Sequence, residues 1–525
     1  MKLEKPGRQT GAILLVFVFA LFVANTAGAQ AKKAKRVSGR VQTAEQRGEL
    51  QLAAARPNPL QLRQFLKKMP KGADLHYHLS GGVYAESFIR AAVEDGLCVD
   101  VKKLAFAKCA AVDGDKTIVP ASDALTNQSL YDQLINAFSM RSFVPYAGVS
   151  AHDHFFDTFA KFGGTNPSHK AEWVDEVAAR AASQNEQYME LMETPDFSIA
   201  AKAAGEVGWK DDLKELRDAL LAHNLKENVK AATEYLDGIE KKRREIEHCG
   251  EANATAACKV DVRFIYQILR GFPKEMVFAQ TLLGFEAASA DTERIVGLNF
   301  VMPEDGYISM RDYALQMRMV KYLHEIYPNV HITLHAGELA YGMVPPDGLC
   351  CHIRLAMEAG AERIGHGVDV MFEDRPHELL KEMTAKHVMV EVNLTSNDMI
   401  LGISGKNHPL PMYRQFGVPV ALSTDDEGVS RIDLTNEYVR AVETYDFKYA
   451  DLKRMARTGL EHAFLPGKSV WERRDTFTSV ISECVKDTPG SETPSKSCAE
   501  FLKANEKAQQ QWELEKRFHA FEASF

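Results

Sequence analysis

Short apolar segments with the spacing of β-strands recur along this chain between residues 73 and 423. Most are followed by a stretch in which apolar positions repeat with helical spacing, as in Met310–Ile326 and His352–Ala359. Strands that alternate with helices indicate a parallel sheet, and eight such units predict a (β/α)8 barrel of the TIM type. The eight predicted strands are Ala73–Leu79, Gln187–Met192, Val260–Leu269, Arg294–Val301, Val330–His335, Arg363–His366, His387–Asn393 and Val418–Ser423.

Several segments exceed a plain barrel, which we place at residues 59–466. Insertions are expected near residues 98–136, where Cys98–Asn136 reads as loop, and near residues 200–258. The second insertion contains Asp211–Ile246, whose leucines follow a helical period over its whole length. Surface decoration is the favoured interpretation of that helix, with a lid support or a partner-facing helix as alternatives. Residues 467–525 form a C-terminal extension, polar around Asp487–Ser497 and predicted to end in a charged helix, Ala499–Phe518.

The first 29 residues have the pattern of an export signal. Lys2, Lys5 and Arg8 precede an apolar run, Gly11–Ala24, that is too short to span a bilayer comfortably. Small residues at Ala27–Ala29 then suit a cleavage site. We therefore predict a signal peptide at 1–29, a polar leader at 30–58, and an exported, periplasmic or secreted, protein that does not contact the membrane after cleavage. An uncleaved membrane anchor is the alternative.

The cysteines agree with an oxidising compartment. Three pairs lie close together in polar, loop-like stretches, and local disulfides are expected there. Cys350 and Cys351 are adjacent and are predicted to be two buried, small apolar side chains. The three expected pairs are Cys98 with Cys109, Cys249 with Cys258, and Cys484 with Cys498.

Composition excludes one class of function. The 525 residues are 45% hydrophobic and 26% charged, with a formal net charge of −9, which is ordinary for a globular protein. Because no strong basic patch is visible, we expect no nucleic-acid surface.

Polar residues at the predicted strand ends carry the chemistry. His76 and His78 are two apart on the first strand, so both rings lie on one side of it. His335 ends the fifth strand, and Asp425 follows the eighth. Three imidazoles and a carboxylate would complete a metal site, and zinc takes such ligands. Glu338, three residues after His335, is well placed to move protons near a metal-activated water.

His366 and Asp426 complete the candidate site. Glycines flank His366, so a substrate can come close, and the ring could orient and stabilise the attacking hydroxide. A fourth metal ligand or a structural histidine is the alternative. Asp425 and Asp426 are adjacent and point in different directions, so one can bind metal while the other bonds substrate. The remaining histidines are predicted to be structural or exposed, including His169, His223, His324, His377, His387 and His408.

These residues together resemble the adenosine deaminase family of metal-dependent barrel hydrolases. The resemblance runs from about Pro59 to Pro466. It includes Phe155–Phe162, similar to the family's helical segment over the substrate pocket, and Leu460–Pro466, similar to its closing helix. The leader and the cysteine-bearing insertions look more like secreted members, similar to the adenosine deaminase-related growth factors.

The resemblance implies a role for each residue of the site. One zinc per chain would be bound by His76, His78, His335 and Asp425. Glu338 would protonate the purine ring nitrogen next to the attacked carbon, with His366 as the second catalytic residue. Substrate would contact His78, Ser80, Met302 and Asp426, and Asp426 would accept a hydrogen bond from the far side of the purine.

Two positions depart from the family pattern. Ser80 stands where an acidic residue usually contacts the sugar, and Met302 stands at or near a usual glycine beside the purine edge. We predict hydrolytic deamination of adenosine or deoxyadenosine, a small-molecule purine nucleoside, and leave oligomeric state open. Deamination of another 6-aminopurine, or an extracellular nucleoside-binding or signalling protein on the same scaffold, are the alternatives. A nucleotide is disfavoured, because no Lys/Arg cluster lies beside the motifs.

Overall fold

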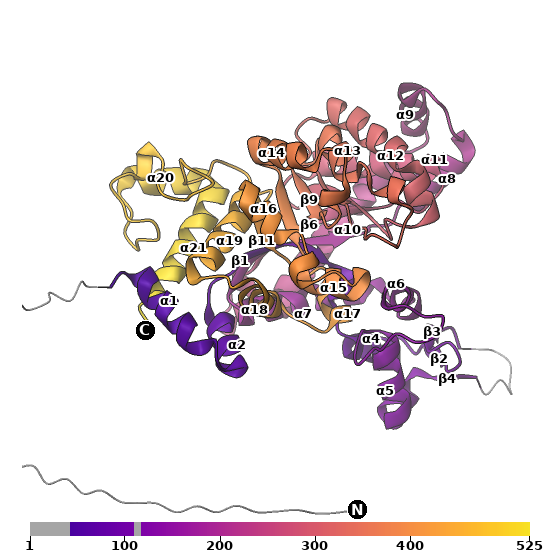
Figure 1. Ribbon diagram of the computed structural model, residues 1–525. Coiled ribbons are helices and arrows are strands. Elements are labelled where there is room, and N and C mark those ends of the chain that lie inside the picture. The colour runs from indigo at the N-terminus through magenta and orange to yellow at the C-terminus, as the bar shows by residue number, and fades with distance from the viewer. Residues whose placement is uncertain (1–41, 110–116) are drawn as a thin grey trace, which may run out of the picture. The chain divides into compact units, whose positions relative to one another are not determined.

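Eight parallel strands close into a barrel in the computed structural model, which describes residues 42–109 and 117–525 (Figure 1). Residues 43–525 form one unit. The predicted signal peptide and residues 30–41 of the predicted leader lie outside the described residues. All eight predicted strands are present, so the prediction of a TIM-type barrel is confirmed. They are β1 (Gly72–His78), β5 (Glu186–Glu193), β6 (Asp261–Leu269), β7 (Ile295–Val301), β8 (Thr333–Ala336), β9 (Arg363–His366), β10 (Met389–Val392) and β11 (Val420–Leu422).

The barrel consists of two four-stranded halves joined by two seams. One half has the order β1-β5-β6-β7 and the other β11-β10-β9-β8. At the first seam, the amide of Asp425 donates to the carbonyl of His76 at 2.9 Å, and the amide of His78 donates to the carbonyl of Asp425 at 3.1 Å. At the second seam, Leu298 pairs with Ile332. The seam between β1 and β11 therefore runs directly through the candidate site.

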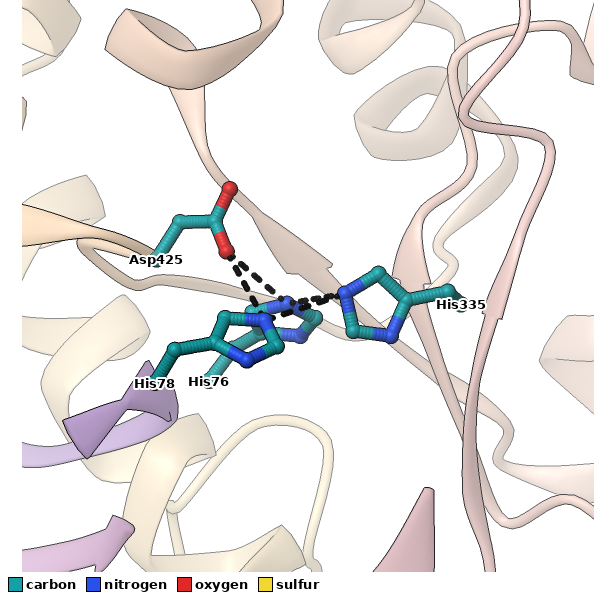
Figure 2. A group of neighbouring side chains, drawn as sticks. All are labelled: His76, His78, His335 and Asp425. Atoms are coloured by element: carbon teal, nitrogen blue, oxygen red, sulfur yellow. Dashed lines mark hydrogen bonds and ion pairs between the residues drawn. The ribbon is translucent and has the colours of Figure 1, made fainter. Parts of the chain in front are cut away.

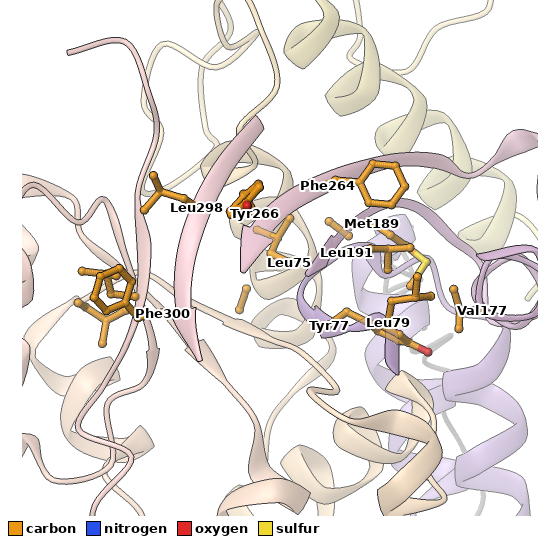
Figure 3. Close-up of a cluster of buried hydrophobic side chains, with 14 of the residues drawn as sticks. Leu75, Tyr77, Leu79, Val177, Met189, Leu191, Phe264, Tyr266, Leu298 and Phe300 are labelled. Atoms are coloured by element: carbon orange, nitrogen blue, oxygen red, sulfur yellow. The ribbon is translucent and has the colours of Figure 1, made fainter. Parts of the chain in front are cut away.

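Strand alternation separates an apolar outer layer from an interior that contains the polar side chains of the candidate site and a smaller apolar cluster. Leu75 and Tyr77 of β1 belong to the buried apolar cluster in Figure 3, together with Leu191, Phe264 and Leu298 of the neighbouring strands. The residues that alternate with them along β1 are Asp74, His76 and His78, which face the interior of the barrel. Alternation thus places both histidines on one face, as the sequence predicts.

Helices connect the strands in chain order. They are α3 (Leu79–Gly82), α4 (Ala85–Glu94), α6 (Ala151–Lys161) and α7 (Lys170–Ser183) before β5; α8 (Ser198–Val207), α9 (Leu213–Leu221) and α10 (Leu225–Ile246) before β6; α11 (Lys274–Ala290), α12 (Tyr307–Ile326), α13 (His352–Ala359) and α14 (Pro376–Lys386) before β7, β8, β9 and β10; α15 (Leu394–Leu401) and α16 (Leu410–Phe416) before β11; and α17 (Glu427–Ser430), α18 (Leu434–Tyr445) and α19 (Tyr449–His462) after it.

Local capping signals explain where the first helices begin. Thr43 accepts a hydrogen bond from the amide of Gln46 in a capping box and starts α1 (Ala44–Ala55). Asn58 caps α2 (Pro59–Lys68), whose first residue is a proline. The predicted polar leader therefore contains a helix, and α1 packs against α19.

The first insertion is more regular than predicted. Residues 98–136 contain a small antiparallel sheet of β2 (Cys98–Asp100), β3 (Ala105–Ala107) and β4 (Ile118–Pro120), followed by α5 (Gln128–Ala137). Strands of three residues are too short for a sequence period to show, which is why this stretch reads as loop.

The second insertion contains two helices where one is predicted. The break at Ala222–Asn224 separates α9 from α10, and Asn224 has a left-handed backbone with φ of 58°. The leucine period continues across the break because Leu220 and Leu225 are both buried in the same apolar core. Apolar periodicity therefore hides the interruption.

The C-terminal extension also differs from the prediction. The predicted helix Ala499–Phe518 is two helices, α20 (Lys496–Ala504) and α21 (Glu506–Glu522), with Asn505 in an extended conformation between them. Figure 1 shows α21 beside α19, and the Arg457 guanidinium pairs with Glu515 at 2.6 Å. The predicted closing helix is helical only as far as His462.

All eight cysteines are paired. The three expected disulfides are present, Cys98–Cys109, Cys249–Cys258 and Cys484–Cys498. The prediction for Cys350 and Cys351 is wrong, because the two are bonded to each other and neither is fully buried. Within the described residues, none of the helices combines the length and the apolar character that crossing a bilayer requires.

Candidate metal centre

The strand ends that form the site turn through left-handed backbone conformations. Met302 after β7, His366 at the end of β9 and Asp425 after β11 have φ of 85°, 67° and 63°. Gly337 after β8 has φ of 71°, and a Cβ there would lie 2.3 Å from Asp369 Oδ1. Residues other than glycine rarely adopt this backbone conformation, and the strain that it causes is concentrated at functional sites. These turns direct the strand-end side chains toward one place.

Four ligand atoms converge there (Figure 2). The Nε2 atom of His335 lies 3.1 Å from Nε2 of His76 and 3.2 Å from Nε2 of His78. The Oδ1 atom of Asp425 lies 3.4 Å from Nε2 of His76 and 3.2 Å from Nε2 of His78. Tetrahedral zinc with bonds of about 2.0–2.1 Å separates its ligand atoms by about 3.3 Å. The spacing therefore fits a single ion of this size.

Hydrogen bonds at the other ring nitrogens turn lone pairs toward that point. The Nδ1 atoms of His76, His78 and His335 lie 2.6, 2.6 and 2.9 Å from oxygens of Glu391, Gln267 and Asn299. A carboxylate or amide oxygen only accepts, so each Nδ1 carries a proton, and each neutral ring presents an Nε2 lone pair.

The carboxylate of the group needs a cation in the same way. Asp425 Oδ2 accepts a hydrogen bond from Ser396 Oγ at 2.6 Å. Its Oδ1 atom is buried and has no hydrogen-bond partner among the described residues. With the rings neutral, three lone pairs and this oxygen point at one place, and a proton or a metal ion between them removes their repulsion. The donor set, nitrogen and oxygen without sulfur, suits zinc.

Protons and a metal would compete for this place. Burial lowers the pKa of His76, but hydrogen bonds and charges from Asp425 and Glu391 outweigh it and raise the pKa to about 10. Burial lowers the pKa of His335 well below its ordinary value. Binding of a metal would therefore release a proton from His76 Nε2.

A chain of charges in the barrel interior supports the ligands. Glu391 accepts a hydrogen bond from His76 Nδ1–H and also forms an ion pair with the Arg363 guanidinium at 2.6 Å. Arg363 in turn pairs with Glu190 at 2.5 Å, and all of these side chains are fully buried. Each charge is thus compensated by a neighbour, as a buried ionic network requires.

Glu338 lies beside the ligands, with its backbone held in place. Glu304 accepts hydrogen bonds from the amides of Gly337 and Glu338 at 3.0 and 2.8 Å, and His352 Nδ1 lies 2.5 Å from the same carboxylate. Burial raises the pKa of Glu338 well above its usual range, and the charges of Asp425 and Glu304 add to this. A raised pKa favours the protonated form of Glu338, which is the form that a proton donor needs.

His366 lies beside Glu338 and Asp425. Its Nε2 atom is 3.7 Å from Glu338 Oε1 and 3.9 Å from Asp425 Oδ2. Burial lowers the pKa of His366 to about 3, so the ring is neutral. It is near the ligand atoms without being one of the four that converge.

Predicted substrate residues line a cavity of about 630 Å³ that opens from these groups. Ser80, Met302 and Asp426 are all part of the lining, as are His78 and Glu338. Burial, with the charge of Asp425, raises the pKa of Asp426 to about 8. At neutral pH the Asp426 carboxyl is therefore protonated and can donate a hydrogen bond as well as accept one.

Met302 occupies a position that favours glycine. Its φ of 85° is a backbone conformation that residues other than glycine rarely adopt. Glycine is also the residue that the family usually has at or near this position. The side chain is 39% exposed and leans on Gly271, where an added Cβ would meet the Met302 methyl at 2.7 Å. Met302 thus narrows the cavity at its rim.

The far wall of the cavity is aromatic and nearly uncharged. Among the described residues that line it, Lys170 is the single lysine or arginine, and its ammonium lies 2.8 Å from Glu193. The segment predicted to cover the pocket is α6 and its end, and it does line the cavity. The aromatic lining comprises Phe88, Phe155, Phe156, Phe159, Phe162 and Trp173.

Sequence reasoning missed the residues that orient the ligands. Gln267, Asn299 and Glu391 each lie on a strand, facing inward, and each holds one imidazole. A signal was available, because polar residues inside otherwise apolar strands need a partner. The position of that partner could not be read from the chain.

Comparisons with known proteins identify what the chain is similar to. The family model described as adenosine deaminase matches residues 171–480, so His76 and His78 lie before the matched segment. The adenosine deaminase of Escherichia coli (strain SMS-3-5 / SECEC) is 37% identical over 136 residues, 26% of this chain and 38% of that enzyme. That of Clostridium perfringens (strain 13 / Type A) is 34% identical over 135 residues, 25% of this chain and 37% of the relative. The chain therefore spans less than two fifths of these curated relatives.

A solved structure matches over much more of the chain. The Arabidopsis ADAL protein in complex with GMP superimposes with a TM-score of 0.50 at 21% identity, covering 76% of this chain and 94% of that one. At this identity the likeness supports the barrel fold.

Proposed function

The chain belongs to the adenosine deaminase family, and from that premise we propose that it is a zinc-dependent aminohydrolase acting on adenosine or deoxyadenosine. Water and the nucleoside would give inosine or deoxyinosine and ammonia. The observation that carries the proposal is the convergence of three imidazole Nε2 atoms and the orphaned Asp425 oxygen beside Glu338, a carboxyl whose pKa is raised by burial. A protein that only binds nucleosides has no need of this arrangement.

The residues divide the chemistry between them. Zinc, held by His76, His78, His335 and Asp425, would make water a nucleophile at neutral pH. Glu338 would give its proton to the purine ring nitrogen beside C6, which makes that carbon electrophilic. Asp426, protonated near neutral pH, would hydrogen-bond the far side of the purine. Ammonia leaves as the 6-oxo product forms.

The charge of the cavity favours an unphosphorylated substrate. Lys170 is neutralised by Glu193, and no other lysine or arginine is among the described residues that line the cavity. A phosphate dianion would find no free cation among the described lining residues. A nucleoside therefore fits better than a nucleotide, although the related Arabidopsis structure holds GMP.

One experiment tests this function directly. Purified protein is incubated with adenosine, deoxyadenosine, adenine, AMP and N6-methyl-AMP, and release of ammonia, or of methylamine from N6-methyl-AMP, is followed. We expect the two nucleosides to be the best substrates. Preference for adenine or a modified purine would favour the alternative suggested by Ser80 and Met302. Binding of nucleosides without ammonia release would favour the extracellular binding or signalling alternative.

Export is part of the same proposal. The disulfides Cys98–Cys109, Cys249–Cys258 and Cys484–Cys498 support an oxidising compartment. N-terminal sequencing of protein recovered from outside the cytoplasm should give a start near Gln30. A retained Met1 would favour the membrane-anchor alternative.

A further inference from the structure

His408 is buried outside the candidate metal centre and accepts a hydrogen bond from a backbone amide. The amide of Leu410 lies 3.1 Å from His408 Nδ1, and His408 is 2% exposed. A backbone N–H can only donate, so Nδ1 of His408 must accept and carries no proton. The proton of the neutral ring is therefore on Nε2. Burial lowers the pKa of His408 to about 4, which agrees with a neutral ring.

That proton sets the orientation of the next residue. His408 Nε2 lies 3.0 Å from Asn397 Oδ1, which must be the amide oxygen because it accepts. Oxygen and nitrogen of an asparagine amide are exchanged easily in structural assignments. Here the hydrogen bond from the Leu410 amide fixes the orientation independently. If the Asn397 amide were turned round, its NH2 group would face the Nε2–H of His408, and both groups are donors.

The amide nitrogen of Asn397 then reaches His366. Asn397 Nδ2 lies 2.9 Å from His366 Nδ1, and both residues are fully buried. An amide N–H only donates, so Nδ1 of His366 accepts and its ring proton is on Nε2. The amide of Asn393 lies 3.4 Å from both ring nitrogens of His366, so it does not select between them.

We propose that Asn397 and His408 are positioning residues that fix His366 as its Nε2–H tautomer through a relay anchored on the amide of Leu410. In this tautomer His366 presents a proton, not a lone pair, to the space beside Glu338 and Asp425. It is then a hydrogen-bond donor to the attacking oxygen, and neither a metal ligand nor the group that removes a proton. The alternative role left open by the sequence, metal ligation by His366, is excluded by the relay.

The kinetic consequence rests on the proposed deamination, but the tautomer does not. A donor fixed in advance costs no reorganisation when negative charge develops on the attacking oxygen. Loss of the relay should lower kcat by about 10–100-fold, the size expected for residues that orient others. KM and zinc content should change little, because neither residue lines the cavity or ligates.

The test reads the tautomer directly. Protein labelled with ¹⁵N-histidine is studied by NMR, with the His366 signals assigned by their loss in His366→Gln. In the parent protein we expect an unprotonated Nδ1 and a protonated Nε2. The isosteric change Asn397→Asp removes the donor and leaves an acceptor, so the protonation pattern of His366 should invert. His408→Gln can still accept from Leu410 and donate to Asn397, and should keep the parent pattern.

Two controls keep the outcomes separate. His408→Leu breaks the relay and should give mixed tautomers and a lower kcat, whereas the exposed His377→Leu should change neither. A parent His366 with an unprotonated Nε2, or an Asn397→Asp protein with the parent pattern, would overturn the relay. Ordered tautomers in a protein that releases no ammonia would overturn the proposed function and leave the relay intact.

Discussion

The Nδ1 atom of His76 lies 2.6 Å from Oε2 of Glu391, and neither side chain is exposed. Burial by itself would raise the pKa of Glu391, but Arg363 and the hydrogen bond from His76 hold it below the usual range. Glu391 is therefore ionised, and it fixes the ring with its Nε2 atom toward the other ligands. Partners of this kind also raise the basicity of a ligating imidazole.

Glu391→Gln should therefore weaken zinc binding by about 10–100-fold, because the change keeps the volume and removes the charge behind His76. Competition with a zinc-binding dye measures the affinity. Glu362→Gln is the matched control, since Glu362 pairs with the half-exposed His331 away from the ligands. Parent-like zinc affinity in a well-folded Glu391→Gln protein would contradict this assignment.

Removal of the metal should abolish turnover and lower stability together. A chelator should give inactive protein, and added zinc should restore it, with one zinc per chain by elemental analysis. Zinc at 100 times its dissociation constant should add about 2.7 kcal/mol to the free energy of unfolding. His76→Ala should lose both effects, and His377→Ala neither. Active protein free of transition metal would rule out the assignment.

Glu338→Gln separates catalysis from metal binding. Glutamine keeps the volume and cannot transfer the proton, so kcat should fall by at least ~10²–10⁴-fold while zinc content and fold persist. Substrate-like inhibitors should still bind. Glu358→Gln, an exposed change on α13, is the control. Parent-rate deamination by Glu338→Gln would show that the proton comes from another group.

His408 should make the protein sensitive to acid. Its pKa is about 4 in the folded protein because of burial, against about 6.5 when unfolded. Below pH 6.5 the unfolded chain binds this proton and the folded one does not, so stability falls as pH falls toward 4. The loss is about 3 kcal/mol from this group. Urea unfolding at pH 7 and pH 4 should show a smaller loss for His408→Gln, and equal losses would refute the prediction.

The disulfide of the C-terminal extension should contribute measurable stability. Cys484 and Cys498 are separated by 14 residues, and closing a loop of that length stabilises a fold by about 3 kcal/mol. The double change Cys484→Ser with Cys498→Ser should lower the free energy of unfolding by that order. Peptide mapping without reductant should recover this pair from the parent, and free thiols there would count against both the bond and export.

Much of the barrel could be predicted because each strand is short, apolar and followed by a helix. Strand ends moved by up to three residues, as at β8, which begins at Thr333 where Val330 is predicted. The ligand residues could be proposed because His76 and His78 share one face of a strand. Their mutual distances depend on the seam between β1 and β11, which joins residues about 350 apart in sequence.

Other features could not be predicted because the pattern of residue types along the chain does not mark them. His408 has no useful neighbour in the sequence, yet it reaches His366 through Asn397. The breaks at Asn224 and Asn505 interrupt helices whose apolar periods continue through them. The bond between Cys350 and Cys351 joins neighbours whose spacing gives no sign of whether they are oxidised.

The two seams of the barrel give the metal a second role. His76 and His78 belong to one four-stranded half, whereas His335 and Asp425 belong to the other. Neither half alone holds more than two of the four ligands, so a tight site arises only after the halves have met. A metal ion bound by these four residues would connect the two halves of the barrel. Without the metal, the amide protons of β1 and of the residues after β11 should be the first to exchange with solvent. Metal binding should therefore stabilise the contact between the two halves of the barrel.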